Sequence, residues 1–367
     1  MNAWAHAIRT GWVVTGEVPG PDVDEFADPA EITRALAGAQ SATLLAVQHP
    51  HRTPEGRGLS LAEALPRARR VLDGLLTSAY REVHDVVAVY EVAGRTIGVL
   101  CLVDPSIVNV RHSEQVYQRI VDDRTIALSG LGLATSAAML VPLSDGERLT
   151  AAARRATVGR EPAVTTKDAH RLWLIGPGPV QDELLAIAQS GPLLVADGNH
   201  RVAAAAAAHT GLFALVTAGP DLHVGAIHRA LTGTGLSHAD LADAWRRIGL
   251  TVHEVPDAEP PRLPGTVTVS PDLVVELPEP DGPLPHIDHG TVEDLLLARA
   301  LGVDPEGPHV RVVPEGHDPG PDVDALLQLA PVPLADVLAV HDQGRRMPRK
   351  ATYFTPKPRS GLLLAQL

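Results

Sequence analysis

The feature that most constrains the fold of this chain is residues 193–202, Leu-Leu-Val-Ala-Asp-Gly-Asn-His-Arg-Val. An apolar run, typical of a buried strand, ends at Asp197-Gly198, and the alanine-rich residues 202–209 that follow predict a helix. A helix of such small side chains packs closely on a sheet, which brings its first turn near the ends of neighbouring strands. The pattern therefore predicts an α/β arrangement around this point of the chain.

The turn at Asp197-Gly198 also has the chemistry of a phosphate site. Gly198 permits close approach of the backbone, and the first turn of the next helix offers unpaired N–H groups and a positive dipole end. His200 and Arg201 add donors there, a position that is unfavourable for cations unless an anion lies between them. Asp197 is predicted to hold a magnesium ion or to orient a hydroxyl. An ordinary Asp-Gly turn, with Asn199 as the helix cap, is the alternative.

Length and patterning indicate a mixed fold. The 367 residues suit two or three modest domains, and only 3% are aromatic, so the core is expected to be mainly Ala, Leu and Val. Helical spacing at 61–78 and 238–248 and β-rich runs at 83–90, 96–103 and 212–217 occur without strict alternation. The sequence therefore predicts an α+β (mixed α/β) fold.

Shorter elements are predicted along the rest of the chain. Residues 41–48 have the pattern of a buried strand, residues 49–58 that of a loop, and a helix is expected near 29–39. Further helices are predicted at 181–189, 292–301 and 334–341. Further strands are predicted at 137–142, 172–175, 251–255, 266–270, 273–277, 351–354 and 361–367.

Charge and cysteine content restrict the partners and the compartment. The chain has 31 basic and 44 acidic residues, a formal charge of −13, which argues against nucleic acid because phosphate neutralisation needs a basic face. The single cysteine, Cys101, fits a reducing cytoplasm. No uncharged apolar run reaches the roughly 20 residues that cross a bilayer, and no signal peptide is recognised. We expect a cytoplasmic protein without a membrane partner, and the sequence leaves a homo-oligomer open.

A second cationic segment lies near the C-terminus. Lys350, Thr352, Tyr353 and Lys357 bring charge and hydroxyl groups together in an otherwise acidic chain. Anion binding by this segment and simple packing of Tyr353 and Phe354 are both compatible with the pattern.

Several segments, in order along the chain, resemble one family. The Asp-Gly-Asn-His-Arg segment is similar to the A-D-G-H-H-R segment of the bacterial and archaeal domain-of-unknown-function 1015 family. Residues 110–124 resemble its I-R-P-H-E-x-T…E-D-R stretch, and residues 226–229 its Y-x-R segment. Residues 346–357, followed by Ser360-Gly361-Leu362, resemble its C-terminal M-P-x-K-S-T-Y-F-x-P-K…S-G-L signature. Asn199 replaces the first histidine of H-H-R, and Ser113 replaces the histidine before Glu114.

The resemblance implies a fold and a division of the chain. That family resembles the ParB/sulfiredoxin-like fold in its motif region. A ParB/sulfiredoxin-like core is therefore expected at 105–235, flanked by N- and C-terminal α/β segments at 1–104 and 236–367.

The resemblance also implies a chemistry. The relatives with known chemistry are free serine kinases, which phosphorylate the amino acid with ADP or ATP. By resemblance, Glu114 is the base, and Asp197, Gly198, His200 and Arg201 match the segment that holds the phosphates. The chemistry of the turn adds Asp197 as the Mg²⁺ ligand and second catalytic residue. The predicted phosphate- or nucleotide-binding residues are Gly198, Asn199, His200 and Arg201 of this segment, together with Arg229, Lys350 and Tyr353 elsewhere in the chain.

Two functions follow from these residues. The first is a small-molecule kinase that uses Mg²⁺ with ATP or ADP and transfers a phosphoryl group to a small hydroxyl substrate, with free L-serine as the best candidate. The second is a non-catalytic nucleotide- or phosphate-binding module. A sulfiredoxin-like redox activity is disfavoured, because position 199 is Asn where that chemistry needs a cysteine.

Overall fold

The computed structural model describes residues 3–22, 29–219, 222–279, 285–320 and 322–367. Two compact units emerge, both made of discontinuous segments. Unit 1 comprises Met1–His112, Val116–Leu222 and Pro356–Leu367, and unit 2 comprises Ser113–Gln115 and His223–Thr355. These boundaries differ from the divisions at 104/105 and 235/236 expected from the sequence. Both units mix helices with sheets, which confirms the predicted mixed α/β class.

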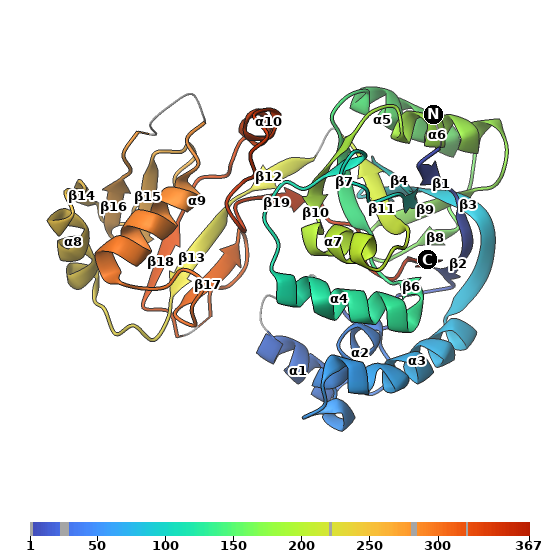
Figure 1. Ribbon diagram of the computed structural model, residues 1–367, viewed down its shortest axis with the longest axis horizontal. Coiled ribbons are helices and arrows are strands. Elements are labelled where there is room, and N and C mark those ends of the chain that lie inside the picture. The colour runs from blue at the N-terminus through green and yellow to red at the C-terminus, as the bar shows by residue number, and fades with distance from the viewer. Residues whose placement is uncertain (1–2, 23–28, 220–221, 280–284, 321) are drawn as a thin grey trace. The chain divides into compact units, whose positions relative to one another are not determined.

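Unit 1 is built on one large mixed sheet (Figure 1). Among the described residues its main path runs β5-β10-β7-β11-β4-β3-β2-β20-β6, with β1, β8 and β9 paired beside it. The strands are β1 (Ala5–His6), β2 (Ile8–Val14), β3 (Tyr80–Val92), β4 (Arg95–Val103), β5 (Val110–Arg111), β6 (Leu133–Ala134), β7 (Ala138–Pro142), β8 (Val164–Thr165), β9 (His170–Ile175), β10 (Leu193–Asp197), β11 (Leu212–Thr217) and β20 (Leu363–Gln366).

Helices cover both faces of this sheet, which therefore has two cores (Figure 1). In β11, Phe213 and Leu215 belong to one core, and Ala214 and Val216 to the other, as strand alternation requires. The helical segments of the unit are α1 (Pro29–Gly38), α2 (Leu44–Gln48), η2 (Pro50–Arg52), η3 (Pro54–Gly56), α3 (Leu61–Ser78), α4 (Gln118–Leu131), α5 (Gly146–Thr157), α6 (Pro179–Ala188) and α7 (Asn199–Ala207).

The strand predicted at 41–48 is wrong, because this segment forms helix α2. The Thr43 side chain caps the helix by accepting a hydrogen bond from the N–H of Ala46 at 3.2 Å. Leu44, Leu45 and Val47 are buried. A short apolar run has no period long enough to separate a buried strand from a buried helix, and here the cap decides.

The β-rich runs predicted at 83–90 and 96–103 form the antiparallel strands β3 and β4, and the helix predicted at 61–78 is confirmed. Helix α3 begins with a capping box, in which the Ser60 hydroxyl accepts from the N–H of Glu63 and the Glu63 carboxylate accepts from the N–H of Ser60. Ala64, Ala68, Leu72 and Leu75 bury one face. Strands β1 and β2 and helices α4 and α5 were not expected from the sequence.

Unit 2 combines a six-stranded antiparallel sheet with a two-stranded ribbon among the residues described. The sheet has the order β14-β16-β15-β18-β13-β17, with β14 (Val252–Glu254), β16 (Leu273–Glu276), β15 (Thr266–Ser270), β18 (Ala325–Gln328), β13 (Ile227–Leu231) and β17 (Val310–Pro314). The ribbon pairs β12 (His223–Gly225) with β19 (Tyr353–Thr355).

Helices of unit 2 pack on its sheet around Trp245. The helices of this core are α8 (His238–Arg247) and the π-helical η4 (Val292–Arg299), which continues the short helix α9 (Asp288–Thr291). Helix α10 (Leu334–Asp342) is a further helix of the unit. The buried indole of Trp245 donates a hydrogen bond to the carbonyl of Leu296 at 3.2 Å and so joins α8 to η4. In the part of the chain that the structure describes, no helix has the length and apolar character needed to cross a membrane.

We predict that Ser60→Ala lowers the free energy of unfolding by about 1 kcal/mol, because the capping box loses its hydroxyl acceptor. Urea denaturation followed by circular dichroism measures the change. The matched control is Ser78→Ala at the other end of α3, where the hydroxyl only bonds the Gly74 carbonyl within the last turn. Equal effects of the two substitutions would contradict the capping argument.

Candidate functional site

The predicted phosphate segment forms a strand, a one-residue turn and a helix in unit 1. Strand β10 ends at Asp197, Gly198 is left-handed with φ +97°, and α7 begins at Asn199. Strand β10 is paired in parallel with β5 and antiparallel with β7, so the turn follows a strand held on both sides. The first turn of α7 therefore presents its N–H groups at a fixed place.

Gly198 is required by both its conformation and its surroundings. A Cβ at this position would lie 2.7 Å from Nε of Arg201 and 3.1 Å from Cβ of Ala138. The first contact means that the Arg201 guanidinium passes directly over the turn. The sequence predicts a close approach to the backbone at Gly198, and in the structure the group that approaches it is the side chain of Arg201.

Asp197 lies between two cations. Its Oδ2 accepts from Nη2 of Arg201, one helical turn along, and its Oδ1 accepts from Nζ of Lys357 at 2.9 Å. Nη1 of Arg201 also donates to the Ala137 carbonyl at 2.6 Å. The three side chains are only 17–22% exposed, so the cluster is screened from solvent more than a surface ion pair. It carries one net positive charge beside a helix N-terminus, which favours an anion.

Lys357 contacts the predicted site but is not one of the predicted site residues. The sequence places this lysine only in the C-terminal cationic segment, whereas in the structure its ammonium contacts the Asp197 carboxylate. The two residues are 160 positions apart, and no local pattern links them. The one sequence signal for this contact is that Lys357 belongs to the segment that resembles the family's C-terminal signature.

His200 and Asn199 are held by residues that precede α4. The N–H of Tyr117 donates to Nε2 of His200 at 3.0 Å, so the ring proton of the neutral imidazole resides on Nδ1. The two rings are parallel, with centroids 5.9 Å apart. Oδ1 of the buried Asn199 contacts Nδ1 of His112 at 3.2 Å. Residues 112 and 117 therefore fix the orientation of the first turn of α7.

The fit of a magnesium ion at Asp197 follows from these contacts. Both carboxylate oxygens already accept hydrogen bonds from cations, and an ion bound there would have to displace an ammonium or a guanidinium. The described ranges contain no group of three or more His, Cys, Asp or Glu residues that could hold a metal. Asp197 is thus better suited to orient Arg201 and Lys357 than to serve as a resident metal ligand.

We predict that Gly198→Ala is more destabilising than Gly132→Ala by about 1–2 kcal/mol. Both glycines have positive φ, but the space beside Gly132 is open, so the control carries only the backbone penalty. The excess at 198 comes from pushing Arg201 off its partners. Equilibrium urea unfolding of the two variants gives the comparison, and equal losses would show that the Arg201 contact has no weight.

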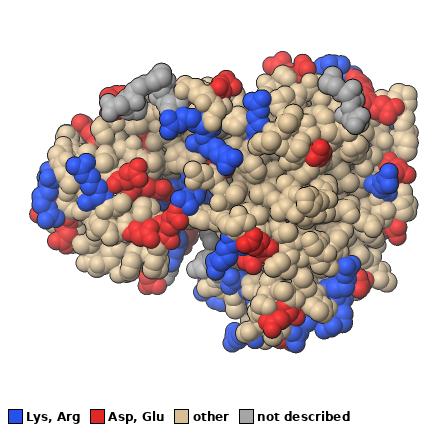
Figure 2. All heavy atoms as spheres, in the orientation of Figure 1, with Lys and Arg blue, Asp and Glu red and all other residues tan. Residues whose placement is uncertain are grey.

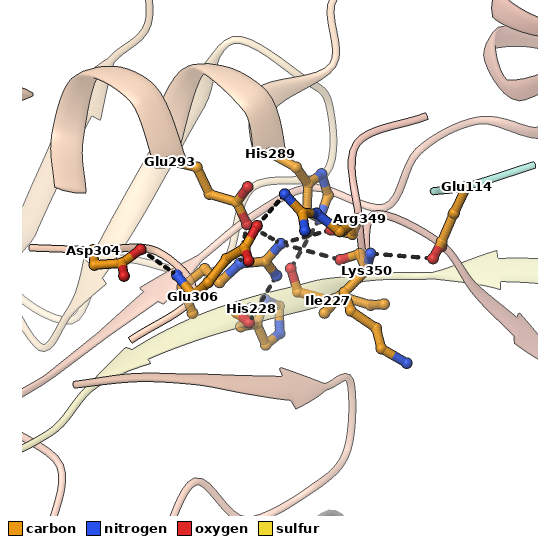
Figure 3. A network of polar contacts seen from close by, with 10 residues as sticks. Glu114, Ile227, His228, His289, Glu293, Asp304, Glu306, Arg349 and Lys350 are labelled. Atoms are coloured by element: carbon orange, nitrogen blue, oxygen red, sulfur yellow. Dashed lines mark hydrogen bonds and ion pairs between the residues drawn. The ribbon is translucent and has the colours of Figure 1, made fainter. Parts of the chain in front are cut away.

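Glu114 lies in unit 2, in an irregular segment. It forms a parallel bridge with Met347, whose N–H donates to the Ser113 carbonyl at 2.8 Å. Its Oε2 accepts from the N–H of Lys350 at 3.2 Å (Figure 3). Its Oε1 accepts from the Thr352 hydroxyl at 3.0 Å. The contact of Lys350 with Glu114 is thus made by the backbone, and the carboxylate is oriented by two donors.

Arg229 belongs to the same network but is deeply buried, at 1% exposure. Its Nε and Nη2 donate to Oε1 of Glu293 at 3.0 and 2.7 Å, and its Nη2 also reaches the carbonyls of Arg349 and Lys350 (Figure 3). Arg349 in turn pairs with Glu306. The phosphate contact predicted for Arg229 would require the guanidinium to give up these partners. The arrangement instead makes Arg229 a support for the 349–350 turn.

Tyr353 lies in β19 and packs edge-on against His317, with ring centroids 5.9 Å apart. Tyr353 therefore packs against a neighbouring side chain, as the packing alternative for this segment predicts.

On the face shown in Figure 2, Lys and Arg side chains lie among Asp and Glu side chains.

Buried His289 gives unit 2 a pH dependence. Its Nε2 donates to the Ile227 carbonyl at 3.0 Å, and burial, followed by the charge of Arg229, lowers its pKa to about 3. Between pH values of about 6.5 and about 3, the unfolded chain binds a proton at this histidine that the folded protein does not bind.

We predict that the free energy of unfolding decreases as the pH is lowered through this range, by about 1.4 kcal/mol per pH unit from this group. His289→Gln should flatten that slope in denaturation at a series of pH values, and an unchanged slope would assign it elsewhere.

Sequence comparison identifies a family for the stretch that contains most of these residues. Residues 84–263 match the family described as "Protein of unknown function (DUF1015)". The stretch includes Glu114, the 197–201 segment and Arg229, whereas Lys350, Tyr353 and Lys357 lie outside it. No curated protein matches the sequence.

Structure comparison finds likenesses at low sequence identity. "Free serine kinase in complex with AMP" is similar with a TM-score of 0.41 and 12% identity, over 72% of this chain and 92% of that one. SbnI from Staphylococcus aureus gives 0.44 and 13%, over 73% and 87%. A conserved hypothetical protein from Pyrococcus furiosus gives 0.40 and 13%, over 72% and 95%.

Proposed function

Because the chain belongs to the DUF1015 family, and because it carries the resembling motif at 197–201, we propose that it is a small-molecule phosphotransferase. It transfers a phosphoryl group from ATP or ADP to a small hydroxyl substrate. The observation that carries the proposal is the Asp197 cluster, in which two cations are held on one carboxylate at the start of a helix.

The nucleotide phosphates bind at Gly198–Arg201. Helix N–H groups, the Nδ1–H of His200 and the two cations are donors that a phosphate chain accepts from. Asp197 keeps Arg201 and Lys357 positioned before the ligand arrives and balances their charge. Phosphoryl transfer depends mainly on such positioning and charge neutralisation, so few reacting groups are needed.

Glu114 is the proton acceptor in this proposal. Its carboxylate takes the proton of the substrate hydroxyl while the oxygen attacks the terminal phosphorus, and the bond from that phosphorus to the bridging oxygen breaks. The products are a phosphomonoester and ADP or AMP.

The acceptor and the metal come from the resemblance. Free L-serine is the proposed acceptor, and Mg²⁺ accompanies the nucleotide as part of the bound substrate. Mg²⁺ is commonly held through substrate phosphates and one or two carboxylates, which agrees with an Asp197 whose oxygens already accept from Arg201 and Lys357.

A non-catalytic nucleotide-binding module is the second candidate. The observation that favours it is the engagement of both Glu114 oxygens by Lys350 and Thr352, which competes with proton transfer. A redox function has no such support, since Cys101 is buried and burial raises the pKa of its thiol to about 12.

We predict a new phosphomonoester resonance when protein, Mg²⁺ and ATP or ADP are incubated with L-serine and followed by phosphorus NMR. Asp197→Asn and Glu114→Gln should each lower the rate at least about 100-fold, because one disorders the cations and the other removes the base. The matched controls are Asp182→Asn and Glu161→Gln, which make the same changes at two exposed positions. Both should keep the wild-type rate.

The same spectra separate the two candidates. Nucleotide resonances that broaden without any product identify a binding module. Neither product nor broadening would contradict both.

A further inference from the structure

Unit 1 contains a cavity of about 380 Å³ on the face of α4 that packs toward α7. Its walls come from α2 and η2, from α4, from β6 and from the start of β11. Helix α7 contributes Arg201 and Ala205, which are one turn apart. Ala127 of α4 and Ala205 of α7 both line the cavity, and their small side chains leave room in it. Its volume is within the range of small-ligand sites.

The walls of the cavity are mainly apolar. They include Leu61, Leu128, Leu131, Leu133 and Phe213. Hydrogen-bonding groups interrupt this surface, because Gln48, Thr135 and Ser136 also line it, and Nε2 of Gln48 donates to the Thr135 hydroxyl at 2.9 Å. An occupant must therefore combine apolar faces with polar edges. An acyl chain offers these polar groups no hydrogen-bond partner, whereas a nucleobase can form hydrogen bonds with them.

The rim of the cavity carries positive charge. Arg52, Arg119 and Arg124 line it together with one acid, Asp123. His49 is on the same wall, and burial, followed by the charges of Arg124, His51 and Arg52, lowers its pKa to about 4. His49 is thus neutral at pH 7, and the charged groups around it favour a ligand with an anionic part.

Arg201 connects this cavity to the phosphate segment. Arg201, whose guanidinium contacts Asp197 and the Ala137 carbonyl, is also one of the residues that line the cavity. A molecule that fills the cavity and reaches Arg201 would therefore have its apolar part in the cavity and its anionic part at the motif.

We propose that this cavity receives the base and sugar of the nucleotide whose phosphates bind at 197–201. The inference rests on the proposed function, since it assigns the remainder of the same ligand. It makes the site selective for a nucleoside polyphosphate over an inorganic one. It also places the nucleoside among residues that the motif does not include, namely those of α2, α4 and β6.

Isothermal titration calorimetry of ADP and of inorganic pyrophosphate tests this assignment. Wild-type protein should bind ADP at least about 10-fold more tightly than pyrophosphate, since only ADP uses the cavity. Ala127→Leu, which fills the cavity, should remove most of this advantage and leave pyrophosphate affinity unchanged. Ala127→Val should have an intermediate effect, and it keeps the test available if the larger side chain impairs folding. Ala151→Leu on the exposed face of α5 is the matched control.

The outcomes separate this inference from the proposed function. Equal affinities of wild-type protein for ADP and pyrophosphate would overturn the nucleoside pocket while leaving the phosphate site standing. An ADP advantage that survives both Ala127 substitutions would overturn it as well. If neither ligand binds, the proposed function fails, and the inference fails with it.

Discussion

The ion cluster of Asp197, Arg201 and Lys357 is the interaction on which the account of unit 1 depends. It joins the end of β10, the first turn of α7 and the C-terminal segment that supplies β20 to the same sheet. A partly buried carboxylate stabilises two cations that the helix N-terminus alone would repel. The cluster thereby keeps the positive charge of the proposed phosphate site in place before any ligand binds.

Unit 2 solves a similar problem with a different residue. Buried Arg229 binds Glu293 and the backbone carbonyls of residues 349 and 350. The N–H of Lys350, in the same turn, donates to Glu114 and orients it. An arginine that resembled a phosphate ligand in sequence is in the structure a support for the backbone around the proposed base. Its charge is matched inside the unit, as a buried cation requires.

The sequence predicted those parts that depend on neighbours along the chain. Residues 193–209 were predicted as strand, turn and helix because the apolar run, Asp-Gly and the alanine segment are contiguous. Helix α3 was predicted because apolar residues recur with helical spacing over its eighteen residues. Segment 41–48 failed because it is too short to show a period. The Lys357 contact, the burial of Arg229 and the cavity behind Arg201 depend on residues brought together by the sheets, so no local pattern contained them.

Amide NMR of the isotopically labelled protein tests the central claim most directly, because it reports on the turn without requiring turnover. On addition of ADP, the account predicts that the backbone N–H resonances of Gly198, Asn199, His200 and Arg201 shift more than those of other helix starts, such as α8. The N–H groups at the start of α7 would then be phosphate donors. Large shifts elsewhere with none at 198–201 would contradict the account and remove the phosphate role from this turn.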